Sequence, residues 1–153
     1  MKQQKVEILL VEDDPADVEL TTRSLQKHGQ NANVIHARDG AEALDFLFCR
    51  GAFAERSMNQ LPQVVLLDLK LPRVSGHEVL KTIKTNERTR CIPVIVMTSS
   101  NLEGDLVECY REGVNSYIQK PVDLTRFQEA VRQFGIYWLG VNHAVPEAAY
   151  QMQ

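Results

Sequence analysis

Two stretches of this chain are apolar on every residue, and they limit the folds that the chain can adopt. The run VVLL at 64–67 is followed by Asp68, and the run PVIVM at 93–97 is followed by Thr98. A strand with no polar face is buried on both faces, as in a parallel sheet covered by helices on each side. The two runs therefore predict an α/β fold built around a parallel sheet.

Similar runs alternate with helical patterns along the whole chain. Further strands are predicted at ILLV (8–11), NVIHA (33–37) and SYIQ (116–119), and each strand is followed by apolar residues at helical spacing. Helix starts are indicated by Pro15 and by two capping boxes, one opening at Ser75 and one at Ser100, and the first helix is predicted to end at His28. Five strand–helix repeats predict a doubly wound five-stranded parallel sheet with helices on both faces.

Length and charge exclude several classes of protein. The 153 residues suit one domain, and 17 Lys and Arg against 20 Asp and Glu give a net charge of −3 with no basic run, so we expect no nucleic-acid partner. No apolar run approaches the roughly 18 residues of a membrane span, so we expect no membrane partner. Cys49, Cys91 and Cys109 form no CxxC pair, which favours reduced thiols and a cytoplasmic location.

Most of the candidate chemistry lies where the predicted strands end. The carboxyl ends of parallel strands meet at one edge of the sheet, which is where ligands bind in doubly wound folds. Acids, a hydroxyl and a cation therefore converge there. They are Glu12, Asp13 and Asp14 after the first strand, Asp68 after the third, Thr98 ending the fourth and Lys120 after the fifth.

Carboxylates crowded at one edge repel each other, so positive charge must offset them. Lys120 supplies one such charge, and oxygen ligands of this kind suit Mg²⁺. An aspartate beside Mg²⁺ and a lysine is a plausible phosphoryl acceptor. Taken singly, Asp14 is better read as a helix cap, Thr98 as a turn residue and Lys120 as a solvated side chain.

Four strings in the chain resemble, in order and spacing, the receiver domains of two-component response regulators. They are LLVEDDP, VVLLDLKLPRVSG, PVIVMTSS and GVNSYIQKPV, and the resemblance spans about residues 5–138. It implies a flavodoxin-like sheet of order 2-1-3-4-5 that accepts a phosphoryl group from a sensor histidine kinase. The receiver is then a signalling module rather than an enzyme, although it catalyses its own phosphorylation and dephosphorylation.

The resemblance also assigns roles to individual positions. It implies that Asp68 is the phosphoacceptor and that Lys120 pairs with the phosphoryl group, at a Lys120–Pro121 bond that matches the family's cis peptide. The remaining roles are metal binding and switching. The implied Mg²⁺ site comprises Asp13, Asp68, Glu12 through water and the backbone carbonyl of Lys70, and the implied switch residues are Thr98 and Tyr117.

The end of the chain departs from a minimal receiver. The receiver is predicted over 1–140, with its fifth helix at about 123–140 and a tail at 141–153 too short for an output domain. On that helix Leu124, Phe127, Val131, Phe134 and Trp138 form one apolar stripe, and further apolar residues follow on a second face. All of them could be core, but a homodimer through this helix is favoured, because Phe134, Tyr137 and Trp138 cannot all face the sheet.

A second departure is a longer loop within 50–63. This loop, the run YWL and the segment CYREGVNSYIQKPV make the chain most similar to single-domain regulators of cyanobacterial and bacterial phytochrome kinases. Two other functions remain open. An aspartyl-phosphate phosphatase is disfavoured, because such enzymes need a second acid two residues after the nucleophile and this chain has Lys70 there. A phosphorylation-independent adaptor is disfavoured because it would not need the acids.

Overall fold

The predicted strands form one parallel sheet with the order β2-β1-β3-β4-β5. The computed structural model describes residues 5–27 and 32–150. The strand order and the doubly wound architecture inferred from the sequence are confirmed. The strands are β1 (Ile8–Val11), β2 (Val34–Ala37), β3 (Val64–Leu67), β4 (Val94–Thr98) and β5 (Ser116–Gln119).

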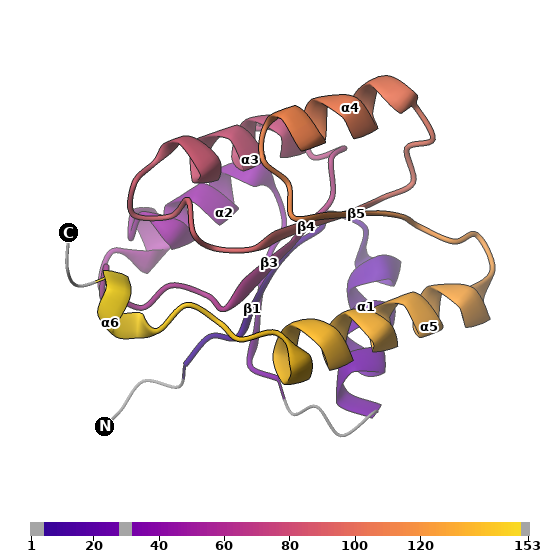
Figure 1. The fold of residues 1–153 in the computed structure, drawn as a ribbon, viewed down its shortest axis with the longest axis horizontal. Helices are drawn as coiled ribbons and strands as arrows, with labels where there is room; N and C mark the ends of the chain where they lie inside the picture. Colours follow the sequence, from indigo (N-terminus) through magenta and orange to yellow (C-terminus); the bar gives the residue numbers. More distant parts are fainter. Residues whose placement is uncertain (1–4, 28–31, 151–153) are drawn as a thin grey trace.

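Helices cover both faces of the sheet (Figure 1), with α1 and α5 on one side and α2, α3 and α4 on the other. They are α1 (Pro15–Lys27), α2 (Gly40–Leu47), α3 (Gly76–Thr85), α4 (Glu103–Arg111), α5 (Leu124–Gly135) and α6 (Glu147–Tyr150), with a 3₁₀ turn η1 (Gly51–Phe53) and a π-helix η2 (Ile136–Val141). The predicted end of the first helix at His28 lies outside the described residues.

Alternate residues of each strand enter two separate apolar layers. Ile8 and Leu10 of β1 pack with the buried residues of α1 and α5, whereas Leu9 and Val11 pack with those of α2 and α3. All four side chains are buried. A strand that serves two layers must be apolar on both faces, which explains the unbroken apolar runs in the sequence.

The strand register brings the carboxyl ends of the strands level with one another. Val11 pairs with Ala37 on one side and with Leu67 on the other, and Thr98 pairs with Gln119. The residues that follow these strands are therefore neighbours at one edge of the sheet.

The two predicted capping boxes have different outcomes. Ser75 caps α3, because its hydroxyl accepts a hydrogen bond from the backbone N–H of Glu78. The second box is wrong: α4 follows Leu102 without a side-chain cap. The hydroxyl of Ser100 instead accepts a 3.3 Å hydrogen bond from Leu102 N, one residue before the N–H that a capping box would use, and it donates to the Asp105 carboxylate at 2.5 Å.

The fifth helix is more complex than predicted. Phe127, Val131 and Phe134 are buried against the sheet, but Leu124 is 54% exposed because it lies in the first turn, before the helix reaches that layer. Past Gly135 the helix widens into η2, which packs Trp138 on the core and leaves Tyr137 48% exposed.

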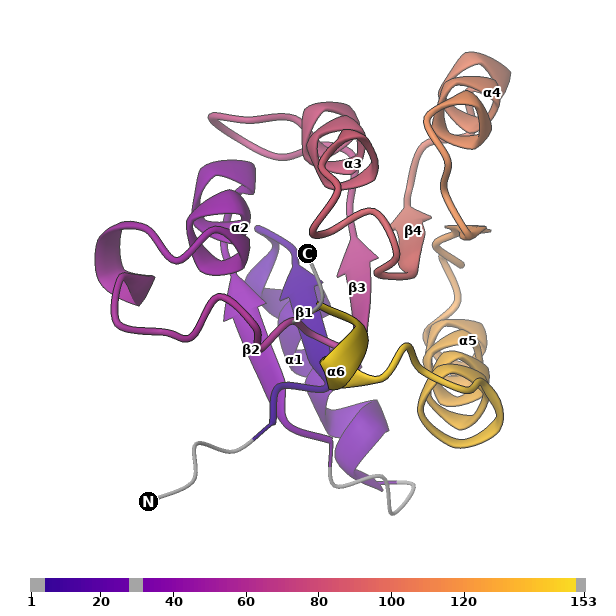
Figure 2. The same ribbon diagram turned by 60° about the vertical axis from the view of Figure 1, so that its left-hand side comes forward.

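Beyond η2 the chain crosses to the amino ends of the strands, where α6 lies beside their starts (Figure 2). Val145 and Tyr150 of this segment join the apolar layer under α2 and α3. The loop at 50–63 lies at the same end and is held by Arg56, which donates to the carbonyls of Phe46 and Gln60. Among the described residues, no helix has the length and apolar character needed to cross a membrane.

Candidate functional site

Lys120 lies at the centre of a buried charge cluster at the carboxyl edge of the sheet. Its Nζ donates to Glu12 Oε2 at 2.7 Å, to Asp17 Oδ2 at 2.7 Å and to Asp68 Oδ2 at 2.9 Å. The Lys120 side chain is 10% exposed, and those of Glu12 and Asp68 are 6% and 8% exposed. One ammonium thus faces three carboxylates in a site largely shielded from water.

This arrangement raises the pKa values of Glu12 and Lys120 for different reasons. Burial raises the pKa of Glu12 to about 7, and the charge of Asp68 adds to that rise, whereas the hydrogen bond from Lys120 opposes it. Burial alone would lower the pKa of Lys120, but its hydrogen bonds to Asp17, Glu12 and Asp68 outweigh this and raise that pKa. The cluster as a whole carries more negative than positive charge, so it favours a further cation.

The residues present fit a divalent cation of the Mg²⁺ type. Carboxylate oxygens of Glu12, Asp13 and Asp68 all lie within 4.8 Å of one another. Asp13 is exposed while the other two are buried, so one side of the set is open to solvent. Hard oxygen donors, few carboxylates and access for water are what Mg²⁺ requires.

Local backbone structure holds Asp68 in place. Its N–H donates to the carbonyl of Val11, which ties the end of β3 to β1. The start of α3 packs directly on its backbone, because a Cβ at Gly76 would lie 2.3 Å from the Asp68 carbonyl oxygen. Only glycine permits that approach. Asp68 is therefore fixed from two sides before any ligand binds.

The two predicted switch residues lie behind this cluster. Thr98 is fully buried, and its hydroxyl oxygen accepts a 3.3 Å hydrogen bond from Ser100 N. The Tyr117 hydroxyl is buried without a hydrogen-bond partner among the described residues, and burial raises the pKa of this phenol. Both hydroxyls are therefore weakly held.

The remaining predicted site features adjoin the cluster. Asp14 is exposed, and its carboxylate accepts from Ala16 N at 2.9 Å, as expected for a residue that caps α1. Lys70 has an exposed side chain, and its N–H donates to Asp68 Oδ1 at 3.3 Å. The described peptide bonds are all trans, including Lys120–Pro121, so the cis bond implied by the resemblance is absent; the trans form is the lower-energy isomer of most X–Pro bonds.

Sequence reasoning missed Asp17 as a partner of Lys120. Asp17 lies in the first turn of α1, four residues after Asp13, and that turn starts at the same edge of the sheet as the acids. A helix that follows a strand in a doubly wound sheet begins at this edge, so an acid in its first turn was a usable signal.

Comparison with known proteins places the chain in a family. A model of the response regulator receiver domain matches residues 8–132. The probable methanogenesis regulatory protein FilR2 of Methanothrix harundinacea is 43% identical over 137 residues, which cover 90% of this chain and 86% of FilR2.

Two cyanobacterial regulators are similar in both sequence and structure. Response regulator Rcp1 of Synechocystis is 37% identical over 132 residues, covering 86% of this chain and 88% of Rcp1. The Mn²⁺-bound structure of Rcp1 superposes with a TM-score of 0.85 at 35% identity, over 91% of this chain and 98% of Rcp1.

The phosphorylated cyanobacterial phytochrome response regulator RcpA superposes with a TM-score of 0.86 at 34% identity. That match covers 94% of this chain and all of RcpA. The chain therefore belongs to the response regulator receiver domain family and acts in two-component signalling.

Proposed function

We propose that this protein accepts a phosphoryl group on Asp68 from a sensor histidine kinase in the presence of Mg²⁺, and that phosphorylation changes its partner-binding surface. The observation that carries the proposal is the contact of Lys120 Nζ with Asp68 Oδ2 at 2.9 Å, beside the oxygens of Glu12 and Asp13. No other described aspartate combines a strand end, a buried lysine and two neighbouring acids.

Asp68 has one oxygen suited to attack. Oδ2 is held by Lys120, whereas Oδ1 accepts only a long hydrogen bond from Lys70 N. Attack by Oδ1 on the phosphohistidine of the kinase forms an O–P bond as the N–P bond breaks, and the electron pair of that bond stays on the imidazole. Bound Mg²⁺, held by Asp13, Asp68, the Lys70 carbonyl and, through water, Glu12, would neutralise charge on the transferred oxygens.

Lys120 is positioned to exchange partners when the phosphoryl group arrives. It already donates to three carboxylates, and a phosphoryl oxygen is an equally strong charged acceptor. Thr98 can respond as well, because its hydroxyl accepts from Ser100 N and keeps its own hydrogen free to donate. Tyr117 lies on β5 two residues before Gln119, which pairs with Thr98, and its hydroxyl has no hydrogen-bond partner among the described residues that would oppose its movement.

The donor kinase belongs, in this proposal, to the phytochrome class. Support comes from the likeness to RcpA and Rcp1 over nearly the whole chain. Mg²⁺ is the metal proposed here, since the donor set is all oxygen, and the Mn²⁺ bound to Rcp1 is an ion with similar ligand preferences.

Dimerisation through the end of the fifth helix is part of the same proposal. Ile136, Tyr137 and Val141 are 40%, 48% and 58% exposed, and the Tyr137 ring meets Trp138 edge-on at 5.0 Å. Exposed aromatic side chains are typical of an interface centre. Sedimentation should show a dimer that Tyr137→Ala and Trp138→Ala weaken and that Tyr110→Ala, an equally exposed tyrosine on α4, leaves intact. A wild type that is monomeric at high concentration would refute this part.

Phosphoryl transfer from a purified, radiolabelled phytochrome kinase tests the main proposal. We expect rapid, Mg²⁺-dependent transfer to wild type and to Asp14→Asn, and no transfer to Asp68→Asn. Equal labelling of Asp68→Asn would exclude Asp68 as the acceptor. Binding of the unphosphorylated protein to the kinase without any transfer would favour the adaptor function instead.

A further inference from the structure

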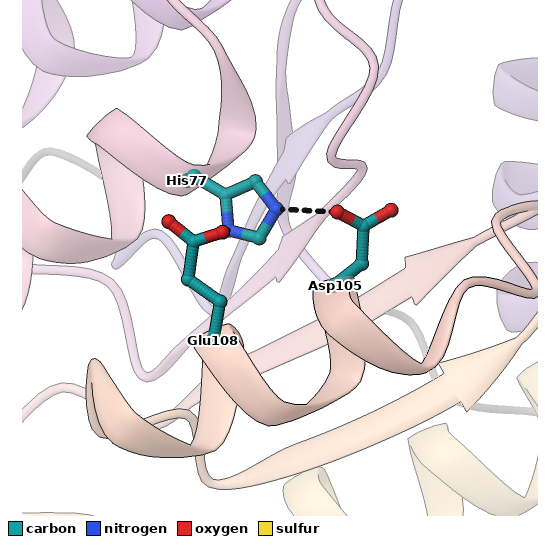
Figure 3. A group of neighbouring side chains, drawn as sticks. All are labelled: His77, Asp105 and Glu108. Atoms are coloured by element: carbon teal, nitrogen blue, oxygen red, sulfur yellow. Dashed lines mark hydrogen bonds and ion pairs between the residues drawn. The ribbon is translucent and has the colours of Figure 1, made fainter.

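Three side chains that could hold a metal ion, those of His77, Asp105 and Glu108, lie between α3 and α4 (Figure 3). His77 lies in the first turn of α3, and it faces Asp105, Glu108 and Cys109 of α4. Glu108 and Cys109 follow Asp105 by three and four residues, so each of them is a neighbour of Asp105 on the helix surface. Nothing in the phosphorylation chemistry above uses this group.

Asp105 sets the orientation of the imidazole. Its Oδ1 lies 3.1 Å from His77 Nε2, and its other oxygen accepts from Ser100 Oγ at 2.5 Å. The hydrogen bonds from Ser100 and then His77 hold the pKa of Asp105 below its usual range. A charged carboxylate can only accept, so Nε2 carries a proton and donates, and the Nδ1 lone pair is left free.

Two further donors converge on that lone pair. Glu108 Oε2 lies 3.7 Å from His77 Nδ1, and Cys109 Sγ lies 3.8 Å from it. Around a tetrahedral Zn²⁺ with ordinary bond lengths, nitrogen and oxygen ligands are about 3.4 Å apart and nitrogen and sulfur ligands about 3.6 Å apart. Small rotations of exposed Glu108 and of the imidazole would therefore complete the geometry.

We propose that His77 Nδ1, a Glu108 oxygen and Cys109 Sγ bind a Zn²⁺ ion, with water in the remaining position. Asp105 is the positioning residue, holding the ring through Nε2 as carboxylates do for zinc-bound histidines. On binding, the Cys109 thiol releases its proton to solvent as its sulfur bonds the metal. The nitrogen, oxygen and sulfur donors select Zn²⁺ over Mg²⁺, whose all-oxygen site lies at Asp68.

The surroundings of Cys109 favour a cation. The residue is fully buried, and the carboxylates of Asp105 and Glu108 lie close to it. A bare thiolate would be unstable there, but a bound metal offsets both the burial and the negative neighbours. Cys109 is also the single buried residue of α4, so a metal here would fix that helix to α3.

The test is a Co²⁺ titration of a Cys49→Ser, Cys91→Ser protein, because cobalt reports the same site through thiolate-to-metal absorption. We expect one equivalent of Co²⁺ to give that absorption, Zn²⁺ to abolish it and excess Mg²⁺ to leave it unchanged. Cys109→Ser should remove the band, and His77→Ala should weaken binding by at least about tenfold. His143→Ala, at an exposed histidine, should leave the thiolate band and the Co²⁺ affinity unchanged.

Glu108→Gln keeps the proposal testable if the buried Cys109 variant fails to fold, since Glu108 is exposed. It should weaken Co²⁺ binding by about tenfold while keeping the thiolate band. Glu112→Gln, one turn further along the same helix, is the matched control and should bind like wild type. The proposal is wrong if no thiolate band forms in the parent protein, or if His77→Ala and Glu108→Gln bind Co²⁺ as tightly as it does.

Discussion

The two ends of the sheet are built from different chemistry. At the carboxyl end, Lys120 meets three carboxylates, and the charges face one another in a shielded site. At the amino end, Tyr150, Val145 and Leu61 extend the apolar layer across the strand starts. The carboxyl end thus carries excess negative charge that can bind a ligand, while buried apolar side chains at the amino end stabilise the fold.

Charged side chains also lie at the amino end, but there they donate hydrogen bonds to backbone carbonyls. The Arg56 guanidinium stacks 3.5 Å above the Phe46 ring and donates to backbone carbonyls, and Arg88 donates to the carbonyls of Met58 and Leu47. These arginines satisfy the backbone of the loop at 50–63 rather than pairing with acids. The comparison predicts that variants at the carboxyl end respond to metal and that variants at the amino end do not.

Lys120→Ala should give the largest change in stability. Removing the ammonium leaves Glu12 and Asp68 buried and unpaired, so we expect the free energy of unfolding to fall by about 3–5 kcal/mol without metal. Saturating Mg²⁺ should restore most of that loss in urea unfolding. Lys84→Ala is the control, since Lys84 donates to carbonyl and amide oxygens, and its loss should not be rescued. An unrescued Lys120→Ala would make Lys120 a purely structural residue.

Asp13→Asn should come next, with an effect on metal affinity rather than on folding. Loss of a directly bound carboxylate should weaken Mg²⁺ binding by more than about 100-fold, or about 2.8 kcal/mol. Titration calorimetry measures this directly. Because Asp13 is exposed, the stability of the metal-free protein should be unchanged or slightly raised. Unaltered Mg²⁺ affinity would contradict the assigned site.

Tyr150→Ala probes the opposite end. The ring is 9% exposed and packs on the apolar layer, so its loss should cost about 2–3 kcal/mol of unfolding free energy, independent of Mg²⁺. Tyr150→Phe keeps the ring and should stay close to wild type in the same denaturation experiment. If Tyr150→Ala altered phosphorylation as strongly as stability, the two ends would not be separable.

Asp14→Ala should have the smallest effect. It removes the carboxylate that accepts from Ala16 N at the start of α1, at a cost of about 1 kcal/mol. Mg²⁺ affinity should change far less than in Asp13→Asn, although the residues are neighbours. Thermal unfolding and calorimetry on the same sample decide this, and a loss of affinity equal to that of Asp13→Asn would place Asp14 in the metal site.

Strand positions and the convergence of Glu12, Asp68 and Lys120 were predictable because both follow from local patterns. Apolar runs identify buried parallel strands, and the carboxyl ends of parallel strands always lie at the same edge of the sheet. The division of the chain at residue 140 and the individual site roles stay predictions, since the geometry brings residues together without assigning what they bind.

Other features depend on contacts that no local pattern reveals. The start of α4 after Leu102, and the hydrogen bond that the Ser100 hydroxyl donates to Asp105, depend on packing in three dimensions. The hydrogen bond from Arg88 to the Met58 carbonyl joins residues that are thirty positions apart in the sequence. The widening of the fifth helix at Ile136 breaks the 3.6-residue period on which the sequence argument relied, so the exposure of individual side chains there was not predictable.

The most direct measurement is the intact mass of the protein after incubation with acetyl phosphate and Mg²⁺. Wild type should gain one phosphoryl group that persists in neutral buffer long enough to be measured. Base or hydroxylamine should remove it, as they remove an acyl phosphate. Asp68→Asn should gain none, and omission of Mg²⁺ should prevent the gain in wild type. A phosphoryl group of the same lability and yield on Asp68→Asn would contradict the account.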